Sequence, residues 1–256
     1  MRRRVLMFTF TLVLGLALAP MVTLAATDVA IAQGGNIYEA TLVEPNQKTP
    51  QVSTEELRRI LADGSAIVVD SRSHAQFVAG HIPGARNLDA PRSGSIAAVE
   101  RLVSGDKSKP LVLYCNGPFC QASRDLSEQL VGAGFTNVRR YQLGIPVWRA
   151  LGGVTEIELD GIVRVFNVDR TAVFLDGRTT EEFSAGSLPG ALNIPVGTTK
   201  FDRHPLLRSE DFNTRIVVFG RDSGQARALA EAIVRVARHN VSYFPGTFDT
   251  LRKAIK

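Results

Sequence analysis

Histidine, cysteine and net charge are all scarce in this chain of 256 residues. The four histidines stand at positions 74, 81, 204 and 239 without the spacing that metal ligands usually show, so no metal site is expected. The formal net charge is only +5, and the basic residues are scattered. This distribution argues against a nucleic-acid-binding protein and is compatible with a small anionic substrate.

The two cysteines, Cys115 and Cys120, lie five positions apart. In an oxidising compartment an even number of cysteines would ordinarily indicate a structural disulfide. The loop that this bond would close is too short to restrict the unfolded chain strongly. A catalytic or redox-active pair is therefore favoured, with a structural crosslink as the alternative.

Long hydrophobic runs are also missing, apart from one near the N-terminus. Val5–Ala19 is apolar, follows three arginines and precedes the small residues 30–32, which is the pattern of a secretory signal peptide. The run is shorter than the roughly 20 residues that a membrane-spanning helix needs. We therefore expect residues 1–32 to be a signal peptide cleaved after Ala32, or alternatively after Ala25. The mature protein would be periplasmic or secreted, with no permanent membrane anchor.

The chain does contain a cysteine-bearing loop between an apolar strand and a helix. Leu111–Tyr114 predicts a buried strand, Cys115 follows it, and a helical pattern runs from about Gln121 to Val131. Loop N–H groups and the helix N-terminus both stabilise a thiolate at such a position. Cys115 is therefore predicted to be a nucleophile rather than an inert thiol.

The rest of the chain alternates short strands and helices after a polar stretch, residues 33–50, that we interpret as a linker. Ser53 starts a capping-box pattern at a predicted helix. Further helices are predicted at 73–78, around 96–103 and through 147–151, and further strands at 66–70 and 137–141. This alternation predicts an α/β fold with a mostly parallel sheet.

An internal repeat divides the chain into two copies of one domain. Residues 172–178 and 186–193 parallel residues 66–72 and 80–87, with the same offset of 106 positions, and 216–220 match 111–115. We predict domains at residues 51–153 and 156–256. The second copy has Gly220 in place of the cysteine and contains no cysteine at all.

The first copy resembles the rhodanese (sulfurtransferase) family. The resemblance rests on Asp70-Ser-Arg72, on Gly80-His-Ile-Pro-Gly-Ala85, on Cys115 in its loop, and on Gly144 and Trp148 near the domain end. It implies two tandem rhodanese-like domains, the first active and the second degenerate. It also implies that Cys115 takes sulfur from a small sulfur-containing anion or a persulfide donor, holds it as a persulfide and passes it to a thiol acceptor, without a cofactor.

The same resemblance assigns the substrate-binding loop to Asn116, Gly117, Pro118, Phe119, Cys120 and Gln121. The loop lacks the Arg or Lys of many family loops. Phosphatases of this fold need an arginine where this chain has Gln121, so a phosphatase is disfavoured. Arg72 and Arg86 are candidate basic residues near the pocket, although a structural ion pair is favoured for Arg72. Asp70 is expected to be a hydrogen-bonding anchor.

Three questions remain open from the residues alone. Cys120 is either a resolving thiol that attacks the persulfide of Cys115 or a residue that only fills its place in the loop. The two cysteines could instead belong to a periplasmic thiol–disulfide protein. A third possibility is that the protein is a non-catalytic binding module. The second domain could bind a protein partner.

Overall fold

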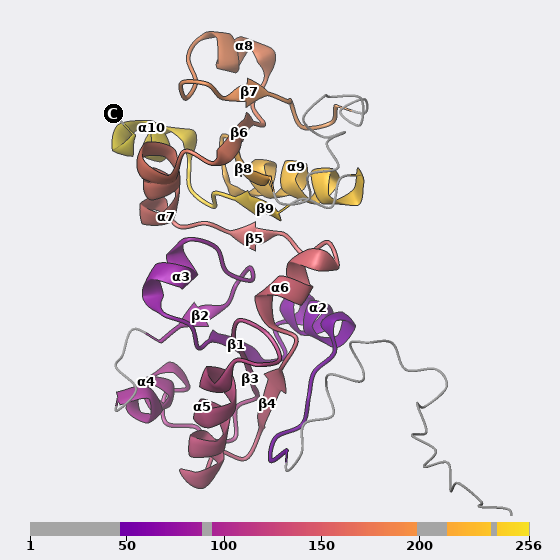
Figure 1. Cartoon of the computed structure of the whole chain (residues 1–256), viewed down its shortest axis with the longest axis vertical. Coiled ribbons are helices and arrows are strands. Elements are labelled where there is room, and N and C mark those ends of the chain that lie inside the picture. The colour runs from indigo at the N-terminus through magenta and orange to yellow at the C-terminus, as the bar shows by residue number, and fades with distance from the viewer. Residues whose placement is uncertain (1–46, 89–93, 199–213, 237–239, 256) are drawn as a thin grey trace, which may run out of the picture. The chain divides into compact units, whose positions relative to one another are not determined.

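The computed structural model describes residues 47–88, 94–198, 214–236 and 240–255 (Figure 1). All of them belong to one compact unit, residues 36–256. The predicted signal peptide and the predicted linker up to residue 46 lie outside the described residues, as do His204 and His239.

The first half of the described chain forms a four-stranded sheet in the order β2-β1-β3-β4, with every neighbouring pair parallel. The strands are β1 (Ile67–Asp70), β2 (Arg86–Asn87), β3 (Leu111–Tyr114) and β4 (Val138–Tyr141). All four residues of β3 are buried. An apolar run with no polar alternation is what a central parallel strand covered on both faces requires.

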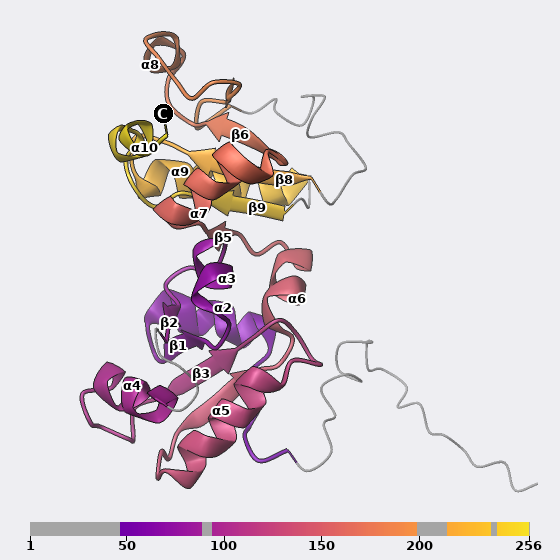
Figure 2. The same cartoon turned by 60° about the vertical axis from the view of Figure 1, so that its left-hand side comes forward.

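Helices cover both faces of this sheet. They are α2 (Thr54–Asp63), α3 (His74–Val78), α4 (Ser95–Leu102), α5 (Gln121–Gly132) and α6 (Gly144–Ala150). One buried cluster joins the sheet to α2, α3 and α6, and includes Leu57, Phe77 and Trp148. The other joins the opposite face to α4 and α5 through Val99 and Leu126. Figure 2 shows α5 running alongside β3.

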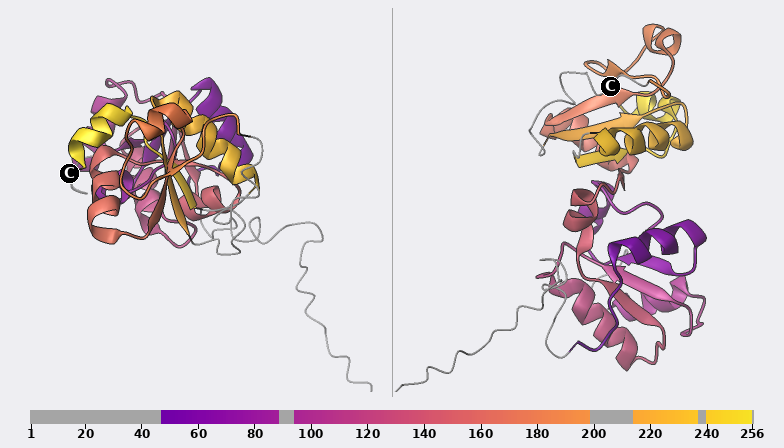
Figure 3. Two further views of the ribbon diagram at one scale, coloured as in Figure 1. Left: turned by 90° about the horizontal axis from the view of Figure 1, so that it is seen from above. Right: turned by 90° about the vertical axis from the view of Figure 1, so that its right-hand side faces the viewer.

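The second half repeats this plan in a five-stranded parallel sheet of order β5-β9-β8-β6-β7. Its strands are β5 (Thr155–Glu156), β6 (Ala172–Asp176), β7 (Leu192–Asn193), β8 (Arg215–Phe219) and β9 (Asn240–Tyr243). Its helices are α7 (Leu159–Arg164), the π-helical turn η2 (Val165–Asp169), α8 (Thr180–Ser184), α9 (Ser223–Val236) and α10 (Phe248–Ala254). In Figure 3, α9 lies along the sheet, where it packs on β8 and β9.

The strand order shows that the two halves are copies. The order β9-β8-β6-β7 matches β4-β3-β1-β2 element by element. Even the additional edge strand has a counterpart, because Gln51 forms an isolated parallel bridge with Arg140 as β5 does with β9. The predicted α/β class with parallel sheets flanked by helices is confirmed.

Local expectations hold for most elements but not at every boundary. Ser53 caps α2 by accepting a hydrogen bond from the Glu56 N–H at 3.1 Å. The last residues of the predicted linker instead pack on the domain: Thr49 is buried, and the Pro50 carbonyl accepts the Arg140 N–H. Neither α7 nor η2 was predicted. Among the described residues, no helix is both long and apolar enough to span a membrane.

Candidate active site

The cysteine loop lies where the direction of sheet winding changes. From β1 the chain passes to β2 on one side, then returns to β3 on the other side of β1. Asp70 and Tyr114, the last residues of β1 and β3, are paired in register. The loops that follow these two strands therefore diverge from a common edge. Such switch points are where open α/β sheets bind ligands.

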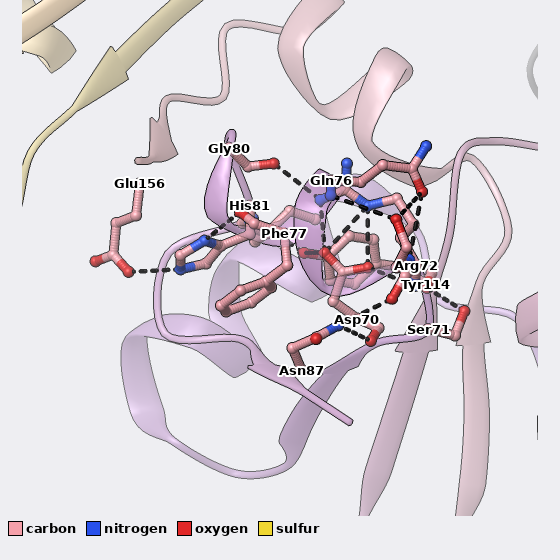
Figure 4. A network of polar contacts seen from close by, with 12 residues as sticks. Asp70, Ser71, Arg72, Gln76, Phe77, Gly80, His81, Asn87, Tyr114 and Glu156 are labelled. Carbon is pink, nitrogen blue, oxygen red and sulfur yellow. Dashed lines mark hydrogen bonds and ion pairs between the residues drawn. The ribbon is translucent and has the colours of Figure 1, made fainter. Parts of the chain in front are cut away.

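A buried polar network fixes the end of β1 (Figure 4). The carboxylate of Asp70 is fully buried and accepts hydrogen bonds from Arg72 Nη2 and the Tyr114 hydroxyl, each at 2.6 Å. Arg72 also donates to the Gly80 carbonyl, and the Asn87 amide donates to the carbonyls of Asp70 and Arg72. The structure thus contains the hydrogen-bonding anchor expected at Asp70 and the structural ion pair expected for Arg72, whose partner is Asp70.

Tyr114 was not identified from the sequence, although it immediately precedes Cys115. Burial, together with the charge of Asp70, raises the pKa of Tyr114 well above its ordinary value. The hydroxyl therefore stays protonated, donates to Asp70, and accepts the Ile82 N–H at 3.1 Å. The residue before the cysteine is thus fixed to both β1 and the segment after α3.

Cys115 itself is buried, with 2 % of its surface exposed. Its carbonyl accepts the Ile145 N–H, and the Cys120 N–H donates to the Gly117 carbonyl at 3.0 Å. Gly144 adopts a φ of 63°, and a side chain there would collide with the Cys115 carbonyl and the backbone of Gly117. A glycine is therefore required at the start of α6 for the loop to keep this path.

The loop presents backbone donors at the start of α5. Within the described part of the chain, the N–H groups of Asn116, Gly117, Phe119 and Gln121 meet no acceptor. Cys120 is the N-cap of α5, and its side chain makes no capping hydrogen bond. Unused donors at a helix N-terminus favour an anion, which here could be a thiolate or a bound substrate.

Cys115 and Cys120 are joined by a disulfide, with their Cα atoms 6.2 Å apart. The sequence left open whether these two side chains interact. The loop brings them into covalent contact across four intervening residues.

A cavity of about 570 Å³ opens beside the two cysteines. Asn116, Arg72, His74 and Asp125 are among its other lining residues. The guanidinium of Arg72 is turned toward Asp70, so it is already paired with a carboxylate. Of the four unused loop N–H groups, the one that belongs to a lining residue is that of Asn116, so it is the candidate donor to an anion bound in the cavity.

Several other predicted site residues do not line this cavity. Gly117, Pro118, Phe119 and Gln121 are not among its lining residues, and Phe119 is 89 % exposed. Arg86 is exposed and lines a different hollow, which shares His74 with the cysteine cavity, so its expected place near the pocket stays a prediction. A larger cavity, of about 740 Å³, is lined by neither cysteine. No group of three or more metal-ligating side chains is found among the described residues.

The second half repeats the anchoring network without the nucleophile. Asp176 accepts from Arg178, which donates to the Gly186 carbonyl, and Asn193 donates to the carbonyls of Asp176 and Arg178. These contacts repeat the Asp70 network at the offset of 106 positions seen in the sequence. The second half thus contains the same anchoring network as the first.

The loop after β8 is filled by a side chain of its own helix. The Gln225 amide oxygen accepts the Arg221 N–H at 2.7 Å, and the Arg221 guanidinium pairs with Glu182. A Cβ at Gly220 would lie 2.9 Å from the same amide oxygen. The backbone N–H of Arg221 in this loop is therefore satisfied internally.

The sequence of this chain is similar to those of known proteins. The family model for the rhodanese-like domain matches residues 53–151 and 166–254. SseB of Mycobacterium tuberculosis, provisionally named a thiosulfate sulfurtransferase, is 26 % identical over 233 residues, covering 69 % of this chain and 81 % of that protein. Thiosulfate sulfurtransferase GlpE of Pseudomonas entomophila is 34 % identical over 100 residues, covering 39 % of this chain and 84 % of GlpE.

Two solved structures also align with most of this chain. The crystal structure of a thiosulfate sulfurtransferase from Pseudomonas aeruginosa aligns with a TM-score of 0.37 and 16 % identity, covering 80 % of this chain and 42 % of that one. The crystal structure of the 3-mercaptopyruvate sulfotransferase SseA from Escherichia coli aligns with a TM-score of 0.34 and 19 % identity, covering 78 % and 98 %.

Proposed function

The chain belongs to the rhodanese-like domain family, and on that premise we propose that it is a sulfurtransferase that carries sulfur on Cys115. The observation that carries this proposal is the position of Cys115 after β3, at the switch point of the first sheet and beside a cavity. The relatives named thiosulfate sulfurtransferase support sulfur transfer in general.

The proposed reaction has two steps. With thiosulfate as the test donor, the Cys115 thiolate attacks the outer sulfur, the S–S bond of the donor breaks, and sulfite leaves with its bonding electrons. Cys115 then holds a persulfide, whose outer sulfur passes to a thiol acceptor. The loop N–H groups would stabilise the negative charge of the thiolate and of the persulfide. The physiological donor is proposed only as a small sulfur-containing anion or a persulfide.

Intact mass of the fully reduced protein, incubated with thiosulfate, tests the proposal. Reduction is necessary because Cys115 is bonded to Cys120 in the structure. We expect one added sulfur atom in Cys120→Ser and none in Cys115→Ser. A Cys120→Ser variant that gains no sulfur would contradict the proposal.

A second candidate function is thiol–disulfide exchange, which the Cys115–Cys120 disulfide favours. A protein of this kind would cycle between dithiol and disulfide and would take no sulfur from thiosulfate. Two results together would support this candidate. The mass of wild type would fall by two hydrogens on treatment with an oxidant, and Cys120→Ser would remain unmodified by thiosulfate. A third reading, a non-catalytic binding module, requires function to survive in Cys115→Ser.

For the second domain we propose a structural or partner-binding role, because Gly220 replaces the nucleophile and Gln225 fills the loop. We also propose that the chain is exported, from the arginine-led apolar run at its N-terminus. The N-terminal sequence of protein recovered from the periplasm or medium tests export, and a chain that retains Met1 in the cytoplasm would contradict it.

A further inference from the structure

The two cysteines differ in their surroundings although they share one loop. Cys115 is buried at the end of β3, whereas Cys120 is half-buried at the N-cap of α5. The 6.2 Å between their Cα atoms lies inside the range of about 4.4–6.8 Å usual for disulfides. The backbone of the loop therefore already allows the Cys120 sulfur to bond to the Cys115 sulfur.

We propose that Cys120 is an internal resolving thiol, which attacks the inner sulfur of the persulfide on Cys115 and releases sulfide. This inference rests on the proposed function, since it needs sulfur to be loaded on Cys115 first. In the step, the Cys120 thiolate forms a bond to the inner sulfur of the persulfide, and the S–S bond to the outer sulfur breaks. The outer sulfur leaves with the electron pair as hydrosulfide, taking the proton that Cys120 gave up. The product is the Cys115–Cys120 disulfide seen in the structure.

Proximity favours this internal route over an external thiol. An external acceptor must enter the cavity and reach a sulfur on a buried residue, whereas Cys120 already lines that cavity. Holding a reactant next to its target removes most of the entropic cost of a bimolecular step. The N-terminus of α5, a helix of twelve residues, also stabilises a thiolate on its N-cap residue.

The asymmetry in burial indicates how the disulfide is reopened. A dithiol reductant, which the proposal requires for further turnover, meets the half-buried residue Cys120 before the buried residue Cys115. Attack on Cys120 expels Cys115 as the thiolate, and the second thiol of the reductant then frees Cys120. Each cycle would thus return Cys115 in the form that accepts sulfur, at the expense of one dithiol.

The test measures sulfite, sulfide and intact mass after reduced, desalted full-length protein is mixed with thiosulfate under anaerobic conditions. For wild type we expect one sulfite and one sulfide per chain, and a mass lower by two hydrogens. Cys120→Ser and Cys120→Ala should release one sulfite and no sulfide, and should gain one sulfur atom. The rate constant for sulfide release by wild type should not depend on protein concentration, because the step is intramolecular.

The outcomes separate this inference from the proposed function. Sulfite without sulfide, together with a stable added sulfur in wild type, would overturn the inference and leave the sulfurtransferase intact. The absence of sulfite from wild type and from both Cys120 variants would overturn the proposed function and the inference with it. Wild type without thiosulfate must keep both thiols, which controls for oxidation by residual oxygen.

Discussion

At the scale of single residues, the carboxylate of Asp70 at the end of β1 binds the Tyr114 hydroxyl of β3 and the Arg72 guanidinium, which in turn binds the Gly80 carbonyl after α3. Asp70→Asn replaces one acceptor oxygen with an NH₂ group that faces the donors of Arg72 or Tyr114. The Arg72 guanidinium, also buried, would lose its charged partner. Breaking a buried pair in this way costs about 3–5 kcal/mol. We expect a loss of that size in the free energy of unfolding, measured by urea denaturation.

Asp176→Asn is the matched control, because Asp176 makes the corresponding pair with Arg178 in the second half. Both variants should be destabilised. Only Asp70→Asn should slow the loading of sulfur on Cys115, since Arg72 and Tyr114 border the cysteine loop. Equal loading rates in the two variants would show that the Asp70 network does not support the site.

The same network shows which contacts of single residues could be predicted from the sequence. The pairing of Asp70 with Arg72 was predictable, because a carboxylate at the end of a buried strand needs donors and Arg72 is two positions away. The hydroxyl of Tyr114 comes from 44 positions away, and its partner depends on the register of β1 with β3. A register of that kind is set by the assembled sheet, so the contact was missed.

At the scale of elements, the start of α6 sets the path of the cysteine loop. Gly144→Ala would add a methyl group against the Cys115 carbonyl and Gly117, and would also strain a backbone with a φ of 63°. A displacement of about 1 Å at a reactive group can slow a reaction by about 10²-fold. We therefore expect sulfur loading on Cys115 to slow by roughly that factor, measured by intact mass against time.

Gly134→Ala controls for backbone strain alone. Gly134 has a φ of 88°, but a Cβ there would meet no atom within 4 Å. Its cost should be about 1 kcal/mol in unfolding free energy, with an unchanged rate of loading. Slow loading of sulfur on Cys115 in Gly134→Ala would show that loss of stability, rather than displacement of the loop, reduces loading.

Elements with a strong local pattern were predictable, and those defined by tertiary packing were not. The strand before Cys115 and the helix after it were expected from apolar periodicity and lie at β3 and α5. Residues 47–50 carry no periodic pattern, yet Thr49 is buried and Pro50 pairs with Arg140 of β4. Arg86 directly follows the turn at residues 80–85, but it lies in β2 and lines a hollow other than the cavity beside the cysteines.

At the scale of the whole described chain, duplication accounts for the presence of the same anchoring network in both halves. The strand order and the Asp176 network persist, because they maintain the fold of each half. The loop after β8 no longer needs free donors, and Gln225 satisfies the Arg221 N–H. The sequence repeat made the duplication predictable. The occupation of the loop by Gln225 was not, because it depends on the direction of one side chain.

Glu156 connects sequence-distant parts of this unit and should make its stability sensitive to acid. Its carboxylate accepts the Tyr243 hydroxyl at 2.6 Å and contacts His81 Nε2 at 3.1 Å. Burial alone would raise the pKa of Glu156, but the hydrogen bonds from His81 and Tyr243 outweigh it, so the pKa lies below its ordinary value. A carboxyl group with a lowered pKa in the folded state stabilises the protein above its unfolded pKa. That contribution is lost as the pH falls through the folded pKa.

Glu156→Gln should therefore be less stable than wild type at about pH 6, and the difference should shrink on acidification below about pH 4.3, the ordinary pKa of a glutamate. Urea midpoints measured across this interval give the comparison. Glu55→Gln, at an exposed glutamate that makes only a surface ion pair, should match wild type at every pH. A difference in urea midpoint between Glu156→Gln and wild type that stays constant with pH would show that the charge of Glu156 contributes nothing to the stability. The side chain would then act only through its shape and hydrogen bonds.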